Sequence, residues 1–243
     1  MISISLKKEL SAGGFFKVKH LKVVGSTNDF LKALPQNKAK EGFVVVADEQ
    51  TNGRGRLGRT FFSKKGGLYF SILLKPSEEV RDFLTVIAAI AVCDAVREYA
   101  NDVGVKWVND VQILGKKCCG ILAESTENLK NYAIVGIGVN LGNTDFDESI
   151  KDIATSVNAD RWELLGEILA NFKALYQNFD KVKIAEEYKA RCSVIGSKVK
   201  VVQNDGEEYF ATAEDLDEDC RLVVRSEDGT QKVLSSGEVK III

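Results

Sequence analysis

Seven consecutive residues, Gly53-Arg54-Gly55-Arg56-Leu57-Gly58-Arg59, alternate glycine with arginine shortly after the apolar run 43–46. Glycine allows positive φ angles and close approach of the backbone to a ligand. Each guanidinium group offers a fork of donors suited to carboxylate or phosphate oxygens. In a chain of net charge -2, this loop predicts a clamp for an anion. The alternatives are a solvated surface loop or an RNA-binding segment, and the position between two predicted strands favours the clamp.

A second stretch, Lys106-Trp107-Val108-Asn109-Asp110, places an amide and a carboxylate side by side where one predicted strand turns into the next. Carboxylate and amide oxygens are hard ligands of the kind that Mg²⁺ binds. Asn-Asp is also an ordinary turn pair. Taken alone, the stretch fits a magnesium site and a plain hairpin turn equally well.

A third stretch runs from Gly115 to Glu124 and begins with two lysines, Lys116 and Lys117. If it alternates as a strand, one of the two points inward, and a buried ammonium group needs an anion. A charged hairpin tip explains the same residues. Cys118 and Cys119 are interpreted as small strand hydrophobes and not as a redox pair.

Two shorter patterns complete the chemistry. Ser26-Thr27-Asn28 precedes a predicted helix, and Ser26 is expected to cap it with Asp29 completing a capping box, which leaves Thr27 and Asn28 free to bind. Gly136-Ile137-Gly138-Val139-Asn140 places small residues in a predicted buried strand, which suits close approach by a ligand. No third glycine and helix follow, as a dinucleotide-binding fingerprint requires.

Composition narrows the class of protein. The 33 basic and 35 acidic residues nearly balance, which argues against a general binder of nucleic acid or membranes. The five cysteines are scattered without metal-ligand spacing and indicate reduced thiols in a cytoplasmic protein. The single histidine, His20, makes a histidine triad or zinc site improbable. We find no signal peptide pattern and no run near the about 18 apolar residues of a membrane span.

The elements that must position these motifs follow from periodicity and turn residues. Strands are predicted over residues 15–24, 43–47, 68–75, 103–107, 111–114, 119–124 and 132–141. Helices are predicted over residues 26–34, 81–100, 162–179 and 185–192. Composition shifts at about Ser193, and short strands over 199–202, 209–215, 221–225 and 231–235 then predict a small barrel.

In order and spacing, five of these stretches resemble the biotin–protein ligase family. The family pattern is Ser-Thr-Asn, Gly-Arg-Gly-Arg-x-Gly-Arg, Lys-Trp-Pro-Asn-Asp, Lys-x-x-Gly-Ile-Leu-x-Glu and Gly-x-Asn. The matching stretches here are Ser26-Thr27-Asn28, Gly53 to Arg59, Lys106 to Asp110, Lys117 to Glu124, and Gly138-Val139-Asn140. The resemblance runs from about residue 20 to the C-terminus.

This resemblance implies an α+β fold: a mixed β-sheet flanked by helices over residues 1–192, of the kind shared with class II aminoacyl-tRNA synthetases, and an SH3-like β-barrel over residues 193–243. It implies an ATP-dependent ligase that makes biotinyl-5′-AMP from biotin and MgATP. The acyl group then passes to a lysine of a biotin carboxyl carrier protein. Because only about 20 residues precede the first motif, we expect the short class without a DNA-binding domain and hence no DNA binding. No membrane partner is expected, and a homodimer is left open.

The resemblance also implies roles for individual residues. Lys117 and Arg54 are the expected catalytic residues, and Asn109 and Asp110 the expected Mg²⁺ ligands. The expected biotin-binding residues are Ser26, Thr27, Asn28, Gln50, Gly53, Arg54, Gly55, Arg56, Lys117, Gly120 and Gly138. The expected ATP-binding residues are Arg54, Arg56, Arg59, Phe61, Asn109, Lys117 and Asn140.

The sequence departs from the family pattern at three places. Val108 replaces the proline of the third motif, which should alter strand rigidity more than chemistry. Phe61-Phe62 replaces the aromatic, usually tryptophan, that follows the arginine loop, so the ring keeps its stacking and loses the indole N–H. The C-terminal arginine found near adenine in some members has no counterpart in residues 240–243.

Two rival readings make different predictions. A lipoate–protein ligase or acyltransferase shares the fold but usually carries an Arg-Arg-x-Ser-Gly-Gly-Gly stretch, which is absent here. A non-enzymatic RNA-binding module using Arg54, Arg56 and Arg59 predicts salt-sensitive affinity for RNA and no turnover of ATP.

Overall fold

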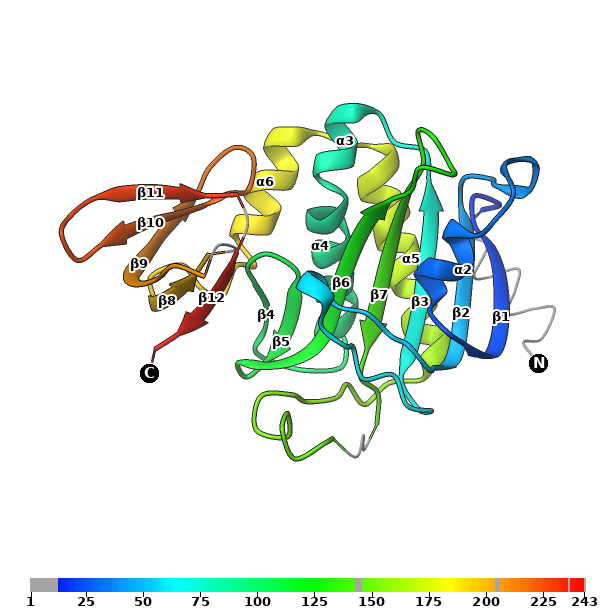
Figure 1. Cartoon of the computed structure of the whole chain (residues 1–243), viewed down its shortest axis with the longest axis horizontal. Coiled ribbons are helices and arrows are strands. Elements are labelled where there is room, and N and C mark those ends of the chain that lie inside the picture. The colour runs from blue at the N-terminus through cyan, green and yellow to red at the C-terminus, as the bar shows by residue number, and fades with distance from the viewer. Residues whose placement is uncertain (1–12, 143–145, 204–205, 236, 243) are drawn as a thin grey trace.

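The computed structural model describes residues 13–142, 146–203, 206–235 and 237–242, whose strands form two sheets (Figure 1). The larger sheet has seven strands in the order β1-β2-β3-β7-β6-β5-β4. Strands β1 and β2 are parallel, and the other neighbours are antiparallel. The predicted mixed sheet is confirmed. Its strands are β1 (Lys17–Val24), β2 (Phe43–Gln50), β3 (Leu68–Leu74), β4 (Val103–Lys106), β5 (Asp110–Ile113), β6 (Lys116–Ser125) and β7 (Ala133–Val139).

Helices cover the two faces of this sheet unequally (Figure 1). The short helix α2 (Thr27–Lys32) packs on one face, against β2, β3 and β7. The long helix α4 (Leu84–Arg97) packs on the other face, and α5 (Arg161–Gln177) packs against α4. Two short 3₁₀ turns, Gln36–Lys38 and Arg56–Gly58, lie in the loops around β2.

Two helix predictions need correction. The helix predicted over 81–100 is two helices, α3 (Glu78–Asp82) and α4, which are separated at Phe83. Ser77 accepts a hydrogen bond from the Val80 backbone N–H, and this cap starts α3 before the apolar periodicity begins. The helix predicted over 185–192 is α6 (Lys181–Lys189), because Asp180 caps it by accepting from the Lys183 backbone. Capping side chains, which satisfy the first backbone N–H groups, decide both starts.

The alternation of side chains along each strand separates a packed face from a face with small residues. In β7, Ala133, Val135, Ile137 and Val139 join the hydrophobic core formed with α4. The intervening Gly136 and Gly138 point to the face that carries α2. Strand β6 repeats this pattern, with Cys119 and Ile121 in the core and Gly120 between them. The α2 face is therefore the one with room for a ligand.

The second sheet has five antiparallel strands in the order β11-β10-β9-β8-β12. Its strands are β8 (Lys198–Val202), β9 (Glu208–Leu216), β10 (Leu222–Ser226), β11 (Gln231–Leu234) and β12 (Glu238–Ile241). Strand β12 was not among the four predicted strands. The predicted barrel is not closed in the part of the chain that the structure describes, because β11 and β12 remain separate edges and do not pair with each other.

The second sheet lies beside β4 and α6 (Figure 1), and side-chain contacts join it to the first part of the chain. The Trp107 indole N–H donates to the Cys220 carbonyl over 3.0 Å, and Lys189 of α6 forms an ion pair with Asp215 at 2.6 Å. The Trp107 side chain is 4% exposed. These contacts hold the smaller sheet beside β4 and β5.

Among the helices of the described residues, none combines the length and the apolar character needed to cross a membrane.

Candidate active site

A cavity of about 150 Å³ opens on the α2 face of the large sheet and brings most of the predicted site residues together. Fourteen of the predicted site residues line it: Ser26, Thr27, Asn28, Gln50, Arg54, Gly55, Arg56, Arg59, Phe61, Asn109, Asp110, Lys117, Gly120 and Gly138. They come from α2, from the ends of β2 and β5, from the glycine–arginine loop and from β6 and β7. The remaining two, Gly53 and Asn140, do not line it.

The inner wall of the cavity is a chain of hydrogen bonds between neutral groups. The side-chain oxygen of Gln50 accepts from the Thr27 backbone N–H over 2.8 Å and lies 3.1 Å from the Thr27 hydroxyl. The Gln50 amide N–H donates to Ser63 over 2.9 Å, and Ser63 donates to the Phe61 carbonyl over 3.0 Å. The inner wall therefore presents donors and acceptors whose directions are fixed by one another.

Beside this wall, Glu124 collects three donors. Its carboxylate accepts from Lys32 over 2.7 Å, from the Asn28 amide over 2.6 Å and from Arg54 over 3.3 Å. Arg54 also forms an ion pair with Asp29. Burial opposes ionisation of Glu124, but the hydrogen bonds of Lys32 and Asn28 and the charges of Lys32 and Arg54 outweigh it, so the pKa of Glu124 lies below its ordinary value. Ser26 caps α2 as predicted. Asp29 does not complete the predicted capping box, because its carboxylate contacts Arg54 instead.

The floor of the cavity depends on glycine. Gly120 and Gly138 are paired across β6 and β7, and the Phe61 ring lies on both. A Cβ atom on Gly138 would stand 2.4 Å from the ring, and one on Gly120 would stand 2.9 Å from it. A Cβ atom on Gly136 would stand 2.3 Å from the Asn28 side-chain oxygen. Each of these positions needs the absence of a side chain, as close approach requires.

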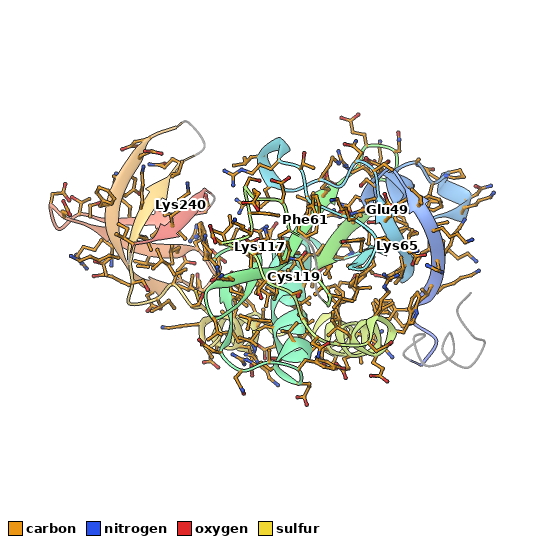
Figure 2. The ribbon with its side chains drawn as sticks, turned by 90° about the horizontal axis from the view of Figure 1, so that it is seen from below. Glu49, Phe61, Lys65, Lys117, Cys119 and Lys240 are labelled. Carbon is orange, nitrogen blue, oxygen red and sulfur yellow. The ribbon has the colours of Figure 1, made fainter. Side chains whose placement is uncertain are left out.

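A β-bulge directs Lys117 into the cavity. The pairing of β5 with β6 runs from Val111–Cys119 to Gln112–Lys117 and skips Cys118. Both cysteines are consequently buried on the core face, and Lys117 lies on the same face as Gly120. The Lys117 ammonium forms an ion pair with Asp110 at 2.6 Å and stands 5.8 Å from the centroid of the Phe61 ring. Figure 2 shows the side chains of Phe61 and Lys117 close together. Lys116, the other candidate, is exposed.

The buried cysteines carry no reactive thiolate. Burial raises the pKa of Cys118 to about 12 and that of Cys119 well above its ordinary value. Since the thiolate is the reactive form, the interpretation of this pair as strand hydrophobes is confirmed. All five cysteines are free.

The glycine–arginine loop closes on itself and reaches the second sheet. The Phe61 N–H donates to the Gly53 carbonyl over 2.9 Å, and the Gly55 N–H donates to the Arg59 carbonyl over 2.7 Å. From the middle of the loop, Arg56 donates to the Asn109 side-chain oxygen over 3.0 Å and to the Gly237 carbonyl over 3.1 Å. One side chain thus connects the loop, the turn before β5 and the smaller sheet.

The two predicted residues outside the cavity support its walls. A Cβ atom on Gly53 would stand 2.4 Å from both the Phe61 carbonyl and the Ser63 hydroxyl, so Gly53 lets the loop return closely. The Asn140 amide donates to the Thr155 carbonyl over 3.0 Å and to the Lys117 carbonyl over 3.4 Å. It holds the strand that carries Lys117.

The predicted set of site residues left out several residues that line the cavity, although some of them lie in stretches singled out from the sequence. Among them are Lys106, Trp107, Thr60, Gly136 and Gly237. Gly136 could have been found, because the same alternation that selects Gly138 selects it. Gly237 gave no signal, since it is brought to the cavity only by the packing of the second sheet.

Both residues of the predicted metal pair already have partners in this structure. Asp110 contacts Lys117, and the Asn109 amide is engaged on both sides, by Arg56 and by the Ile121 carbonyl at 2.8 Å. Within the described residues no group of three or more histidine, cysteine, aspartate or glutamate side chains could hold a metal. The donors therefore fit an ion that a substrate carries with it, and not one held by protein groups alone.

Comparison with known protein families identifies the class of protein to which this chain belongs. Residues 20–140 match the biotin/lipoate A/B protein ligase family, and residues 194–241 match the biotin protein ligase C-terminal domain. The chain belongs to this family. Within this family, both relatives described below are named as ligases, and the second is named as a biotin ligase. The chain is 34% identical to the bifunctional ligase/repressor BirA of Bacillus subtilis, over 88% of this chain and 71% of that one. It is 30% identical to the biotin–[acetyl-CoA-carboxylase] ligase of Mycobacterium tuberculosis, over 97% and 93% of the two chains.

Solved structures agree. The biotin protein ligase from Aquifex aeolicus in complex with biotin and ATP superposes with a TM-score of 0.78 at 31% identity, over 93% of this chain and 98% of that chain. This chain is accordingly a member of the biotin–protein ligase branch of the family, as the order of its motifs predicts.

Proposed function

We propose that this protein joins biotin to ATP, giving biotinyl-5′-AMP and pyrophosphate, and then transfers the biotinyl group to a lysine of a biotin carboxyl carrier protein. The observation that carries the proposal is the make-up of one cavity. A wall of neutral donors and acceptors (Thr27, Gln50) and a charged rim (Lys117, Arg56) meet over a glycine floor. That combination suits a ligand with a polar uncharged ring at one end and a carboxylate at the other.

In the first step, a biotin carboxylate oxygen attacks the α-phosphorus of ATP. The bond between the α-phosphorus and the bridging oxygen breaks, and pyrophosphate leaves. Two anions must approach each other, so the reaction needs fixed positive charge more than a protein nucleophile. Lys117 would bridge the carboxylate and the α-phosphate. Arg54, whose present partners are the carboxylates of Asp29 and Glu124, would turn to the same phosphate.

In the second step, the amine of the acceptor lysine attacks the biotinyl carbonyl carbon and AMP leaves. The intermediate is a mixed anhydride that water destroys, so the loop must shield it. Arg56 and Arg59 would hold the outer phosphates or the closed loop itself, and Phe61 would cover the nucleotide. Thr27, Asn28 and Gln50 would bind the ureido ring, and the bicycle would take the place over Gly120 and Gly138 that the Phe61 ring holds in this structure. Asn140 and Gly53 would act through the strand and loop they support.

Magnesium would be carried by the nucleotide. Asp110 and the Asn109 oxygen would contribute the protein ligands once their present partners, Lys117 and Arg56, turn to the phosphates, and phosphate oxygens and water would supply the rest. When bound, the ion neutralises phosphate charge. Removal of divalent ions with a chelator should abolish adenylation and leave binding of biotin alone intact.

The proposal also covers the location of the enzyme, the division of its chain and its oligomeric state. We place the reaction in the cytoplasm and divide the chain into a catalytic part over residues 1–192 and a C-terminal part over 193–243. Light scattering in solution would decide between a monomer and a homodimer.

A mass measurement tests the proposed function. A carrier domain incubated with biotin, MgATP and this protein should gain the mass of one biotinyl group, and should gain none without ATP. Lipoate tests the nearest rival: pyrophosphate exchange supported by lipoate and not by biotin would overturn the assignment. Salt-sensitive RNA affinity without ATP turnover would favour an RNA-binding module instead.

A further inference from the structure

Ser71 is a polar residue in an apolar strand, and the roles proposed above leave it without a task. It lies in β3 between Val45 of β2 and Gly136 of β7, on the face that carries α2. Its exposed fraction is 0%, whereas the other six residues of β3 are aliphatic or aromatic. A buried hydroxyl needs hydrogen-bond partners, and the partners here are side chains of the inner wall.

The Ser71 oxygen touches two residues at the start of α2. It lies 2.5 Å from the Asn28 side-chain oxygen and 2.7 Å from the Thr27 hydroxyl. The Thr27 hydroxyl in turn lies 3.1 Å from the Gln50 side-chain oxygen. Four oxygen atoms therefore make three contacts, and Ser71 and Thr27 supply only two hydroxyl protons.

Both amide orientations are fixed by other partners. The Asn28 amide nitrogen faces the Glu124 carboxylate at 2.6 Å, so its oxygen faces Ser71 and can only accept. The Gln50 oxygen accepts from the Thr27 backbone, and the Gln50 nitrogen faces Ser63. The Ser71 proton therefore goes to Asn28, and Ser71 can only accept from Thr27.

One proton remains for two contacts of Thr27. The contact with Ser71, at 2.7 Å, has the ordinary length of an O–H···O hydrogen bond, and two unprotonated oxygens at that distance would repel. The contact with Gln50 is longer, and the Gln50 oxygen already has a donor. The Thr27 proton therefore belongs to Ser71. Thr27 and Gln50 are left with acceptor oxygens 3.1 Å apart in residues that line the cavity.

We propose that Ser71 is a positioning residue that fixes the Thr27 proton inward, so that Thr27 and Gln50 together accept one N–H group of the ligand. This inference rests on the proposed function and names the part of the substrate that the inner wall selects. A ureido ring offers N–H donors and meets the paired acceptors, while a dithiolane ring of lipoate offers none. Ser71 thereby contributes to the choice of biotin over lipoate without touching either.

A double-mutant cycle on the full chain tests the proposal, with biotin binding measured by titration calorimetry. We expect Thr27→Val and Ser71→Ala each to raise the biotin Kd about tenfold, the effect of losing one hydrogen bond. If Ser71 acts through Thr27, the double variant should also show about a tenfold rise. The Kd of a non-hydrolysable ATP analogue should stay within about twofold throughout.

Other outcomes are decisive as well. A rise of about a hundredfold in the double variant, or no effect of Ser71→Ala, would overturn the proposal. An equal rise for the ATP analogue would assign Ser71 a structural role only. No biotin binding by the parent protein would overturn the proposed function, and this inference with it. Should Ser71→Ala not fold, as judged by its thermal unfolding, Ser71→Cys completes the same cycle; its weaker thiol should give a smaller rise that vanishes in the Thr27→Val background.

Discussion

At the inner end of the cavity, Thr27 projects from a helix start and Gln50 from a strand end, and their side chains form hydrogen bonds with neutral groups. At the rim, Lys117 and Arg56 are charged, and their partners are an aspartate, an amide oxygen and a backbone carbonyl. The residue Thr27 is 3% exposed, whereas the side chain of Lys117 is 35% exposed. The inner wall is therefore the more buried of the two regions, and the rim is the more exposed.

This difference separates two tasks. Neutral hydrogen bonds in a buried wall discriminate among ligands, because a mismatched ligand leaves a buried polar group without a partner. Charges at a rim stabilise charge that develops during reaction, and they can exchange partners as a loop closes. Substitutions in the wall should therefore act on binding, and substitutions at the rim on rate and retention.

The largest effect is expected at the rim. Lys117→Ala should lower the rate of adenylation about 10²-fold, on the order of 3 kcal/mol in the transition state, because it removes a charge next to the reacting centre. The measurement is biotin-dependent pyrophosphate exchange, with the biotin Kd measured alongside. The neighbouring exposed lysine provides the control, since Lys116→Ala should leave the rate unchanged. A reversal of the two results would mean that the bulge does not direct Lys117 to the substrate.

The next effect sharpens the role of the wall. Gly136→Ala places a Cβ atom 2.3 Å from the Asn28 oxygen, so the start of α2 must shift. We expect the biotin Kd to rise roughly tenfold and stability to fall by about 1–3 kcal/mol, as overpacking does. Titration calorimetry and urea unfolding measure the two. Gly25→Ala, at a glycine with open space around it, should change neither, and equal losses in both variants would remove the steric argument.

The third effect concerns retention at the rim. Arg56→Gly removes the contacts to Asn109 and Gly237, which should favour the open loop and leave the adenylation chemistry in place. Biotinyl-AMP should then escape and label lysines of an unrelated protein such as albumin, several-fold more than with the parent protein. Lys65→Gly, at an exposed position just beyond the loop (Figure 2), is the matched control. Equal labelling by all three proteins, with adenylation intact, would assign the loop another role.

The smallest expected effect is the pH dependence of stability that Glu124, beside the inner wall, contributes. The pKa of Glu124 is lowered in the folded protein from its ordinary value of 4.5, so its contribution to stability is complete above about that pH and is lost as the pH falls through the lowered value. Glu124→Gln should therefore cost on the order of 1 kcal/mol at neutral pH, with partial exposure limiting the loss. The free energy of unfolding, measured by urea at a series of pH values, should converge for the two proteins in acid. Parallel curves would show that Glu124 titrates normally.

Much of the fold and of the site could be predicted from local patterns. The run 43–47 is apolar and short, and it is a buried strand; Leu114-Gly115 carries turn residues, and both adopt the positive φ angles of a tight hairpin. Ser26 precedes α2 and caps it. Features that depend on neighbours far along the chain were not predictable. Strand β12 is one such feature, because its partner β8 lies on the far side of three other strands in sequence. The break at Phe83 was missed for a different reason, since the Ser77 cap that starts α3 lies ahead of the apolar periodicity.

The order of residue types along this chain determined which groups reach the site: one glycine in β6 and two at alternate positions of β7, arginines between glycines, and a polar triplet at a helix start. Period two along a strand and the demands of a helix cap are local, and a sequence states them directly. Tertiary structure alone decided the rest. The skipped Cys118 turned Lys117 and not Lys116 inward, the smaller sheet brought Gly237 to Arg56, and packing of α2 on β3 gave Ser71 its partners. Register, bulges and proton direction depend on contacts between distant segments, which no local pattern contains.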